Sequence, residues 1–320
     1  MTQAQTDLSD PVRSPTLLQC CTAAAGLVVG LVRPKRPDQR FMRGVVDAGL
    51  PDPRCTVAVT ALRQVPRSVP TAAIVEGTFA PARIENSLTS FIVTHPTATF
   101  IVDPAVCTDV ERRAIAQLPA VLRVVVRPPA DTIPTLTALA RLPETPRLDF
   151  ALPTHAHWDH VSGLLDMPDL PVHLHRVERD WIGSGPVAPV GGVRDSLRDR
   201  PIVDYELDGP PVLTFTRSHD LFGDRSVILL DLAGHTPGSV GVLLHTRRGW
   251  ILIAGDAAWH ALQIEKVRQM SSYPGVLVDE DRDETFRTLQ RLHLARHAVT
   301  IVPTHDHRAA LRLPAAAHRA

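Results

Sequence analysis

The stretch Thr154-His155-Ala156-His157-Trp158-Asp159-His160 places three imidazoles and one carboxylate within six consecutive positions. These are ligand types that suit zinc, iron or manganese. In an extended segment, residues two apart point the same way, so His155 and His157 are predicted to bind one metal ion together. Asp159 and His160 are adjacent and need a turn, which directs them to a second position. The spacing therefore predicts two metal ions, an arrangement that suits hydrolysis by a bridging hydroxide. The alternative is a surface loop that is merely rich in histidine.

Four short apolar stretches, which we predict to be strands, each end just before a potential metal ligand. They are residues 150–152 before His155, 228–232 before His235, 251–253 before Asp256 and 301–302 before His305. Strand ends at one edge of a layered sheet are where such folds place their sites. A single histidine after a strand is most often structural, but four ligand groups at four strand ends are hard to explain by packing.

With these motifs in place, the chain resembles the metallo-β-lactamase superfamily. The motif His155-x-His157-x-Asp159-His160 is followed, in the order of that family, by Gly-His-Thr-Pro-Gly at 234–238, Gly-Asp at 255–256 and Pro-Thr-His-Asp at 303–306. The resemblance covers roughly residues 72–306. It implies an α/β fold of four layers, an αβ/βα sandwich, with a short helical extension at the N-terminus.

The resemblance also implies a role for each ligand. The first metal would be held by His155, His157 and His235, the second by Asp159, His160 and His305, with Asp256 bridging the two. Two divalent ions are expected, zinc first, with iron or manganese as alternatives. Asp159 is the candidate to carry a proton towards the leaving group, and Asp103 is expected to support the metal loop. Four further residues are candidates to orient the histidines, with ordinary turn polarity as the alternative reading: Thr154, Thr236, Thr304 and Asp306.

The order and spacing of the motifs resemble the lactonase and glyoxalase II-like branch. We therefore predict hydrolysis of an ester, lactone or thioester. The N-acyl homoserine lactonases carry a tyrosine three residues after the bridging aspartate, where this chain has Trp259. Trp259 and Tyr273 are accordingly the candidate residues of the substrate pocket. The alternatives are a phosphodiesterase, or a metal-binding scaffold of the same fold without catalysis.

Composition narrows the class of partner. The chain has 34 Lys+Arg and 34 Asp+Glu residues among 320. This balance of charge does not favour the binding of nucleic acid, and a small-molecule substrate is expected. The four cysteines show neither a disulfide framework nor a CxxC spacing. Reduced, buried cysteines in a cytoplasmic protein are the expectation. The sequence does not predict an oligomeric state.

The chain is predicted to divide into an N-terminal helical extension, residues 1–70, and a hydrolase domain, residues 71–320. The apolar run at 16–32 is expected to form a helix packed on the domain or on a partner subunit. Membrane association is the minority reading, since a span needs about 20 apolar residues. Residues 182–224 are rich in glycine and proline and are expected to form the loops that shape the substrate pocket.

Overall fold

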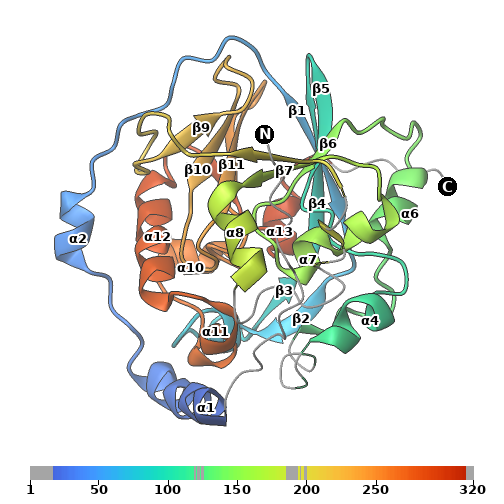
Figure 1. The fold of residues 1–320 in the computed structure, drawn as a ribbon. Helices are drawn as coiled ribbons and strands as arrows, with labels where there is room; N and C mark the ends of the chain where they lie inside the picture. Colours follow the sequence, from blue (N-terminus) through green and yellow to red (C-terminus); the bar gives the residue numbers. More distant parts are fainter. Residues whose placement is uncertain are drawn as a thin grey trace.

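Two β-sheets form the middle of the fold in a computed structural model (Figure 1). The structure describes residues 17–118, 126–184 and 200–314, together with positions 120, 123, 194, 196 and 197. The first sheet has six strands. In spatial order they are β1 (Ala58–Arg63), β4 (Thr89–His95), β5 (Ala98–Val102), β6 (Phe150–Leu152), β7 (Val172–His175) and β8 (Ile202–Tyr205).

The second sheet has five strands and brings the C-terminal half of the chain together. Its strands are, in spatial order, β13 (Thr300–Val302), β12 (Gly249–Ile253), β11 (Val240–Thr246), β10 (Val227–Asp231) and β9 (Ser218–Asp220). A separate hairpin joins β2 (Arg67–Pro70) to β3 (Arg83–Asn86). β12 and β13 are parallel, while β10 and β12 each pair antiparallel to β11, so the ends of β10, β12 and β13 point in one direction.

Side chains alternate between the two faces of each sheet, and this alternation builds the layers. Phe91 and Val93 of β4 enter the core between the sheets, whereas Ile92 packs beneath the outer helices of the first sheet. In β12, Ile253 enters the same central core and Leu252 packs under the helices of the second sheet. The order helices, sheet, sheet, helices confirms the predicted four-layer αβ/βα sandwich.

Short helices cover the outer face of each sheet (Figure 1). Over the first sheet lie α4 (Val110–Arg113), η1 (Ile115–Gln117), α6 (Thr135–Ala140), α7 (Trp158–Val161), η2 (Ser162–Asp166) and α8 (Arg176–Ser184). Over the second lie α10 (Ala261–Lys266) and α12 (Arg282–Ala295). The remaining helices are α1 (Leu17–Val32), α2 (Gln39–Gly44), α3 (Thr71–Ile74), α11 (Ser272–Val278) and α13 (His307–Ala310).

The N-terminal segment differs from the predicted helical extension. α1 lies against α11, and a Cβ at Gly26 would stand only 2.6 Å from Oγ of Ser272. β1, however, is an edge strand of the first sheet, paired antiparallel with β4. Residues 58–63 and 67–70 of the predicted extension are therefore strands. In β1 the side chains of Val59, Ala61 and Leu62 are buried, and the sheet supplies hydrogen-bond partners that the sequence does not reveal.

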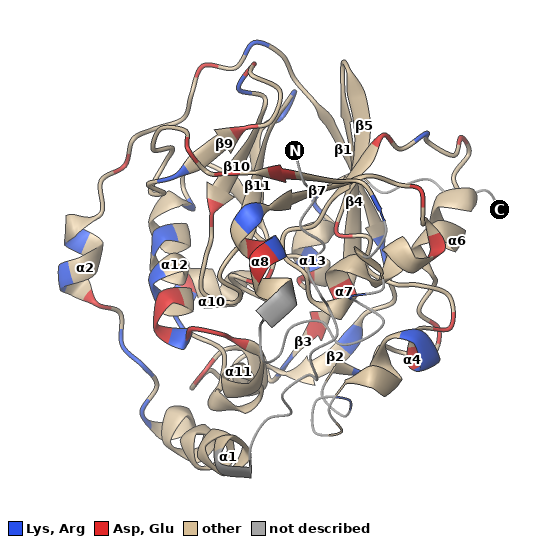
Figure 2. Cartoon of the chain, in the orientation of Figure 1, with Lys and Arg blue, Asp and Glu red and all other residues tan. Residues whose placement is uncertain are grey.

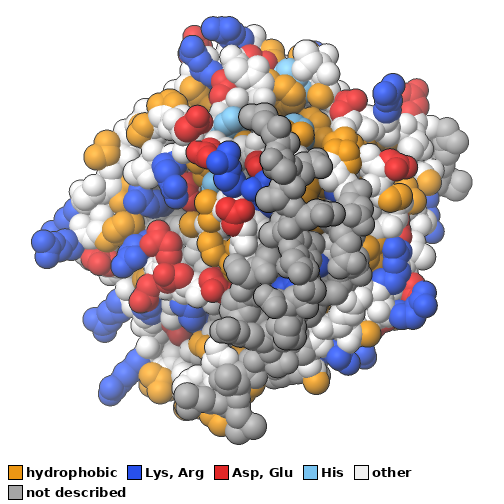
Figure 3. Space-filling view, in the orientation of Figure 1, with side chains coloured by type: hydrophobic (Ala, Val, Ile, Leu, Met, Phe, Trp, Pro, Cys, Tyr) orange, Lys and Arg blue, Asp and Glu red, His pale blue; other side chains and the backbone are white. Residues whose placement is uncertain are grey.

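No helix among the described residues has both the length and the apolar character that a membrane span requires. Basic and acidic residues follow one another along α8 and α12 (Figure 2). On the face shown in Figure 3 basic, acidic and apolar side chains are likewise interspersed. This pattern agrees with the equal numbers of acidic and basic residues in the sequence.

Candidate metal centre

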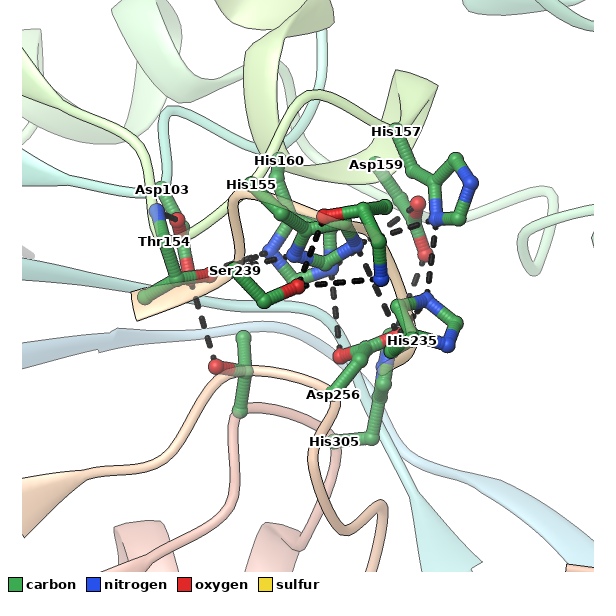
Figure 4. Close-up of polar contacts among 12 residues, drawn as sticks. Asp103, Thr154, His155, His157, Asp159, His160, His235, Ser239, Asp256 and His305 are labelled. Atoms are coloured by element: carbon green, nitrogen blue, oxygen red, sulfur yellow. Dashed lines mark hydrogen bonds and ion pairs between the residues drawn. The ribbon is translucent and has the colours of Figure 1, made fainter. Parts of the chain in front are cut away.

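The histidine-rich stretch leaves the end of β6 and runs into α7. His155 and His157 lie in the loop, with His157 at the N-cap of α7, and Asp159 and His160 fall in that first helical turn. The turn separates the two pairs in space, as their spacing predicted. All four side chains converge on one site (Figure 4).

Three imidazoles form the first cluster. Nε2 of His155 lies 3.0 Å from Nδ1 of His157, which lies 2.9 Å from Nε2 of His235. His235 comes from the loop after β10, so this cluster joins the two sheets. Within the described residues these three donor atoms are close enough to share one metal ion.

A second cluster lies beside the first and contains Asp159, His160 and His305. Nε2 of His305 lies 3.5 Å from Oδ2 of Asp159, and Nε2 of His160 lies 3.9 Å from Oδ1 of the same carboxylate. His305 follows β13, as the sequence predicted.

The carboxylate of Asp256 lies between the two clusters (Figure 4). Its Oδ2 is 3.4 Å from Nε2 of His235 and 4.0 Å from Nε2 of His155. Its Oδ1 is 3.3 Å from Nε2 of His160 and 3.2 Å from Nε2 of His305. One carboxylate therefore faces both sets of imidazoles, with one oxygen directed to each.

Four of the five histidines have a partner for the ring nitrogen that faces away from the clusters. These contacts join Nδ1 of His235 to Asp279 (2.9 Å), of His160 to Asp103 (3.0 Å), of His305 to the Ser87 carbonyl (3.1 Å) and of His155 to the Thr154 hydroxyl (3.2 Å). Such partners orient the rings and leave Nε2 available as a ligand.

Asp103 supports the loop from beneath, as expected. It is fully buried and adopts a left-handed backbone conformation, with φ of 53°. Its carboxylate accepts hydrogen bonds from Thr154 N–H (2.6 Å), from the Thr154 hydroxyl (3.0 Å) and from the Thr304 hydroxyl (3.3 Å). Two of the predicted orienting residues, Thr154 and Thr304, therefore meet at one buried carboxylate, and Thr154 also contacts His155 directly.

Glu178 of α8 connects two metal-bearing loops. Its buried carboxylate accepts hydrogen bonds from Ala156 N–H (2.7 Å), from the Thr236 hydroxyl (2.7 Å) and from Gly238 N–H (3.1 Å). Among the described residues, the Thr236 hydroxyl contacts Glu178 and the Ser239 hydroxyl rather than a cluster histidine. Asp306 caps α13 through Ala309 N–H (3.0 Å). Sequence reasoning missed Glu178, Asp279 and Ser87, since nothing near them in the chain resembles a motif.

Electrostatics shift the pKa values of the imidazoles in opposite directions around an ionised carboxylate. Burial lowers the pKa of His155 and His157 well below the usual value. Burial acts the same way on His160, but the carboxylates of Asp103 and Asp256 outweigh it and raise its pKa. For Asp256 burial raises the pKa, yet the surrounding imidazoles outweigh it and hold the pKa well below the usual range.

An apolar cavity of about 300 Å³ opens onto the second cluster. Its lining includes Asp159 and His305 of the second cluster, together with Trp259 and Tyr273. The Trp259 ring centroid is 4.6 Å from that of His305. The indole Nε1 is buried and has no hydrogen-bond partner among the described residues.

The other walls of this cavity come from a part of the chain to which the sequence assigned no chemistry. Residues from Gln64 to Ile74, with Leu88 and Val126, line much of it. The predicted pocket loops at 182–224 contribute no lining residue in the described part of the chain. Positions 185–193, 195 and 198–199 of that region lie outside the described residues.

Comparison with known proteins agrees with this geometry. A family model described as the metallo-beta-lactamase superfamily matches residues 84–307. A probable metallo-hydrolase of Mycobacterium tuberculosis is 28% identical over 116 residues, which cover 33% of this chain and 36% of that protein. A probable metallo-hydrolase of Bacillus subtilis is 29% identical over 106 residues, covering 32% and 46% of the two chains. The chain thus matches less than half the length of either relative.

Solved structures extend the similarity to most of the chain. An N-acyl homoserine lactone hydrolase with its product bound at the catalytic metal centre has a TM-score of 0.59 at 14% identity, covering 82% of this chain and 98% of its own. The dizinc quorum-quenching lactonase AidC has a TM-score of 0.56 at 12% identity, covering 78% and 87%. At these identities the likeness shows a shared fold.

Proposed function

The chain belongs to the metallo-beta-lactamase superfamily, and on that premise we propose that it is a metal-dependent hydrolase that cleaves a lactone, ester or thioester at a two-metal site. The observation that carries the proposal is the Asp256 carboxylate. One of its oxygens faces His235 and the other faces His305, at 3.4 and 3.2 Å. The second cluster then opens into the apolar cavity.

The residues present fit a pair of divalent ions. Nε2 of His160 and Oδ1 of Asp256 are buried 3.3 Å apart, and neither atom has a hydrogen-bond partner among the described residues. Buried polar atoms are rarely left without partners, so two such atoms facing each other suit a bound cation. Imidazole and carboxylate donors without thiolate suit zinc, with iron and manganese as alternatives.

In this proposal the two clusters divide the ligands. His155, His157 and His235 hold the first ion, while Asp159, His160 and His305 hold the second, and Asp256 bridges them. Such ions lower the pKa of a water to about 7 and stabilise developing oxyanion charge.

The chain's own groups complete the chemistry. Asp159 borders the cavity, so its carboxylate is placed to carry a proton to the leaving group. Glu178 and Asp103 keep the loops in position through buried hydrogen bonds. The Trp259 indole covers one side of the cavity and limits the entry of water, and its unpaired N–H is available to a substrate oxygen.

The cavity favours an acyl substrate with an apolar substituent. Its lining includes Val69, Ile74, Leu88 and Trp259, which suit an alkyl chain more than a charged group. One observation favours a second candidate, a phosphodiesterase. Arg67 and Arg127 also line the cavity, and guanidinium groups bind phosphate well. Arg127, however, pairs with Glu111 at 3.0 Å, which offsets its charge.

A substrate comparison tests the proposal. The metal-loaded protein is assayed with a short-chain and a long-chain homoserine lactone, a thioester and bis(p-nitrophenyl) phosphate, then again after chelation and after zinc is restored. We expect the acyl substrates to turn over, to depend on metal, and to exceed the phosphodiester in kcat/KM. Preference for the phosphodiester would establish the second candidate. Turnover that survives complete removal of metal would contradict both.

A further inference from the structure

A second group of metal-ligating side chains lies at the opposite edge of the sheets. Cys55 precedes β1, His95 ends β4, and Asp224 lies in the turn between β9 and β10. The turn that contains His95 is the tip of the β4–β5 hairpin, at the top of Figure 1. This turn is separated from Asp103 and the metal centre by the five residues of β5, at about 3.3 Å per residue.

The three donor atoms converge within bonding range of one ion. Sγ of Cys55 lies 3.2 Å from Oδ2 of Asp224 and 3.6 Å from Nε2 of His95, and that nitrogen lies 2.8 Å from the same Asp224 oxygen. Ligands of a tetrahedral zinc ion, at bonds of about 2.0–2.3 Å, stand roughly 3.3–3.7 Å apart. The shortest pair, Nε2 of His95 and Oδ2 of Asp224, is a direct hydrogen bond that an ion would replace.

The surroundings hold these side chains in place. The His95 ring is buried and stacks on Phe222, with ring centroids 3.8 Å apart and planes 3° from parallel. Its Nδ1 lies 2.7 Å from the Thr97 hydroxyl, which leaves Nε2 directed at the cluster. The carbonyl of Cys55 accepts a hydrogen bond from Nδ1 of His245, at 2.8 Å, so the backbone of the cysteine is also anchored.

A fourth polar group lies beside the cluster. Ser226 is fully buried, and its backbone N–H donates to Oδ1 of Asp224 at 2.9 Å. Its hydroxyl lies beside the Cys55 thiol and the Asp224 carboxylate. The hydroxyl oxygen is therefore placed to complete the coordination of an ion that the other three side chains hold.

A Cys–His–Asp set also resembles the parts of a thiol nucleophile, but the arrangement is different. In such a site the imidazole contacts the thiol and the carboxylate lies behind the imidazole. Here Asp224 accepts from His95 and lies close to Cys55 as well, so its oxygen is shared by both. Convergence of all three on one point is the geometry of a coordination site.

We propose that Cys55, His95 and Asp224 bind a zinc ion, with water or the Ser226 hydroxyl completing four ligands. On binding, the Cys55 thiol releases its proton to solvent and coordinates as thiolate. The ion would tie the segment before β1 to the β4–β5 hairpin and to the β9–β10 turn. These elements belong to both sheets, so the site is structural and independent of the proposed hydrolysis.

Cobalt(II) tests this site separately from the metal centre. A thiolate bound to Co²⁺ gives a near-ultraviolet charge-transfer band, whereas the ligands of the metal centre are only imidazole and carboxylate. The whole chain is stripped with a chelator, kept reduced with a phosphine and titrated with Co²⁺ alone. We expect the band to reach the intensity of one thiolate-bound Co²⁺ per chain. We expect three equivalents of Co²⁺ to bind to the whole chain. Absence of the band when the protein is saturated with Co²⁺ would overturn the proposal.

Variants assign the band to Cys55. Cys55→Ser should lose it and bind one equivalent less, while turnover at the metal centre is unchanged. The double variant Cys20→Ser/Cys21→Ser, which removes an adjacent pair of free thiols, should keep it. If Cys55→Ser fails to fold, as judged by circular dichroism, His95→Gln is the second variant. It should weaken Co²⁺ binding when the binding is followed by this band. A band that survives in Cys55→Ser, or disappears in the double variant, would show that another thiol binds the ion.

Discussion

Nδ1 of His235 lies 2.9 Å from Oδ1 of Asp279, and Nε2 of the same ring lies 3.4 Å from the Asp256 carboxylate. The imidazole is therefore held between two acidic residues, one at the clusters and one behind it. A carboxylate behind a ligating histidine selects the tautomer and makes the ligand nitrogen more basic.

Asp279→Ala should therefore weaken metal binding by about 10–100-fold, since it removes this support without removing a ligand. Asp279→Asn keeps a hydrogen-bond acceptor and should lose less. The measurement is competition for zinc with a chromophoric chelator. Asp283→Asn is the matched control, because that carboxylate is exposed and pairs with Lys35 at 2.5 Å, away from the clusters. Equal affinity in all three variants would contradict a supporting role for Asp279.

Removal of Asp256 should release metal from the second cluster more readily than from the first. The first cluster keeps three imidazoles, whereas the second keeps two and the Asp159 carboxylate. In a Cys55→Ser background, which excludes the distant thiol site from the count, elemental analysis should give close to two equivalents. Adding Asp256→Ala should lower the count after dialysis and reduce the rate. Two retained equivalents at full rate would show that Asp256 does not bridge.

Trp259 should control substrate size. Trp259→Ala removes an aromatic wall of the cavity, so KM for a long-chain lactone should rise about tenfold, equivalent to about 1.4 kcal/mol, with a smaller effect on a short chain. Trp259→Tyr restores the phenol of the lactonases and should raise kcat. Trp250→Ala is the control, since Trp250 of β12 packs on His245 of β11 and does not line the cavity. Unchanged constants for both lactones would remove Trp259 from the pocket.

Gly234 should tolerate no side chain. Its φ is 134°, and a Cβ there would lie 2.2 Å from the backbone nitrogen of Thr285 in α12. Gly249 also has positive φ, 102°, but a Cβ there meets nothing within 4 Å. Gly249→Ala should cost only backbone strain, about 1–2 kcal/mol. Gly234→Ala adds overpacking of about 1–3 kcal/mol. Chemical denaturation measures the free energy of unfolding of both variants. Equal losses of this free energy would show that the contact with α12 is unimportant.

Glu178 should make stability depend on pH. Burial raises its pKa from 4.5 to about 7, so the folded state holds the proton more tightly than the unfolded state. The resulting stability, about 3 kcal/mol, is present below pH 4.5 and is lost as pH rises towards 7. Glu178→Gln removes this dependence, although its amide N–H₂ then meets donors. The difference in unfolding free energy between the parent protein and Glu178→Gln should change between pH 4.5 and about 7. A constant difference would contradict the raised pKa of Glu178.

The sequence predicted the metal centre because its ligands occur in dense, ordered motifs. His157, Asp159 and His160 lie two, four and five positions after His155, and this spacing already determines which donors can meet. Each further ligand follows an apolar strand whose end lies at the same edge of a sheet. The four-layer fold follows from the same alternation of apolar strands and helical stretches. For these features the local chain order carries the information.

Tertiary structure alone decided what surrounds those ligands. Asp279 and Glu178 are two among 34 acidic residues, and only packing brings their carboxylates behind the metal-bearing loops. β1 and the cavity wall at residues 64–70 are assigned by sequence to an extension because edge-strand pairing and burial depend on elements distant in the chain. Cys55, His95 and Asp224 are separated by 40 and 129 residues, so no spacing rule connects them. Their convergence results from two sheets packed face to face, a long-range constraint that no local pattern encodes.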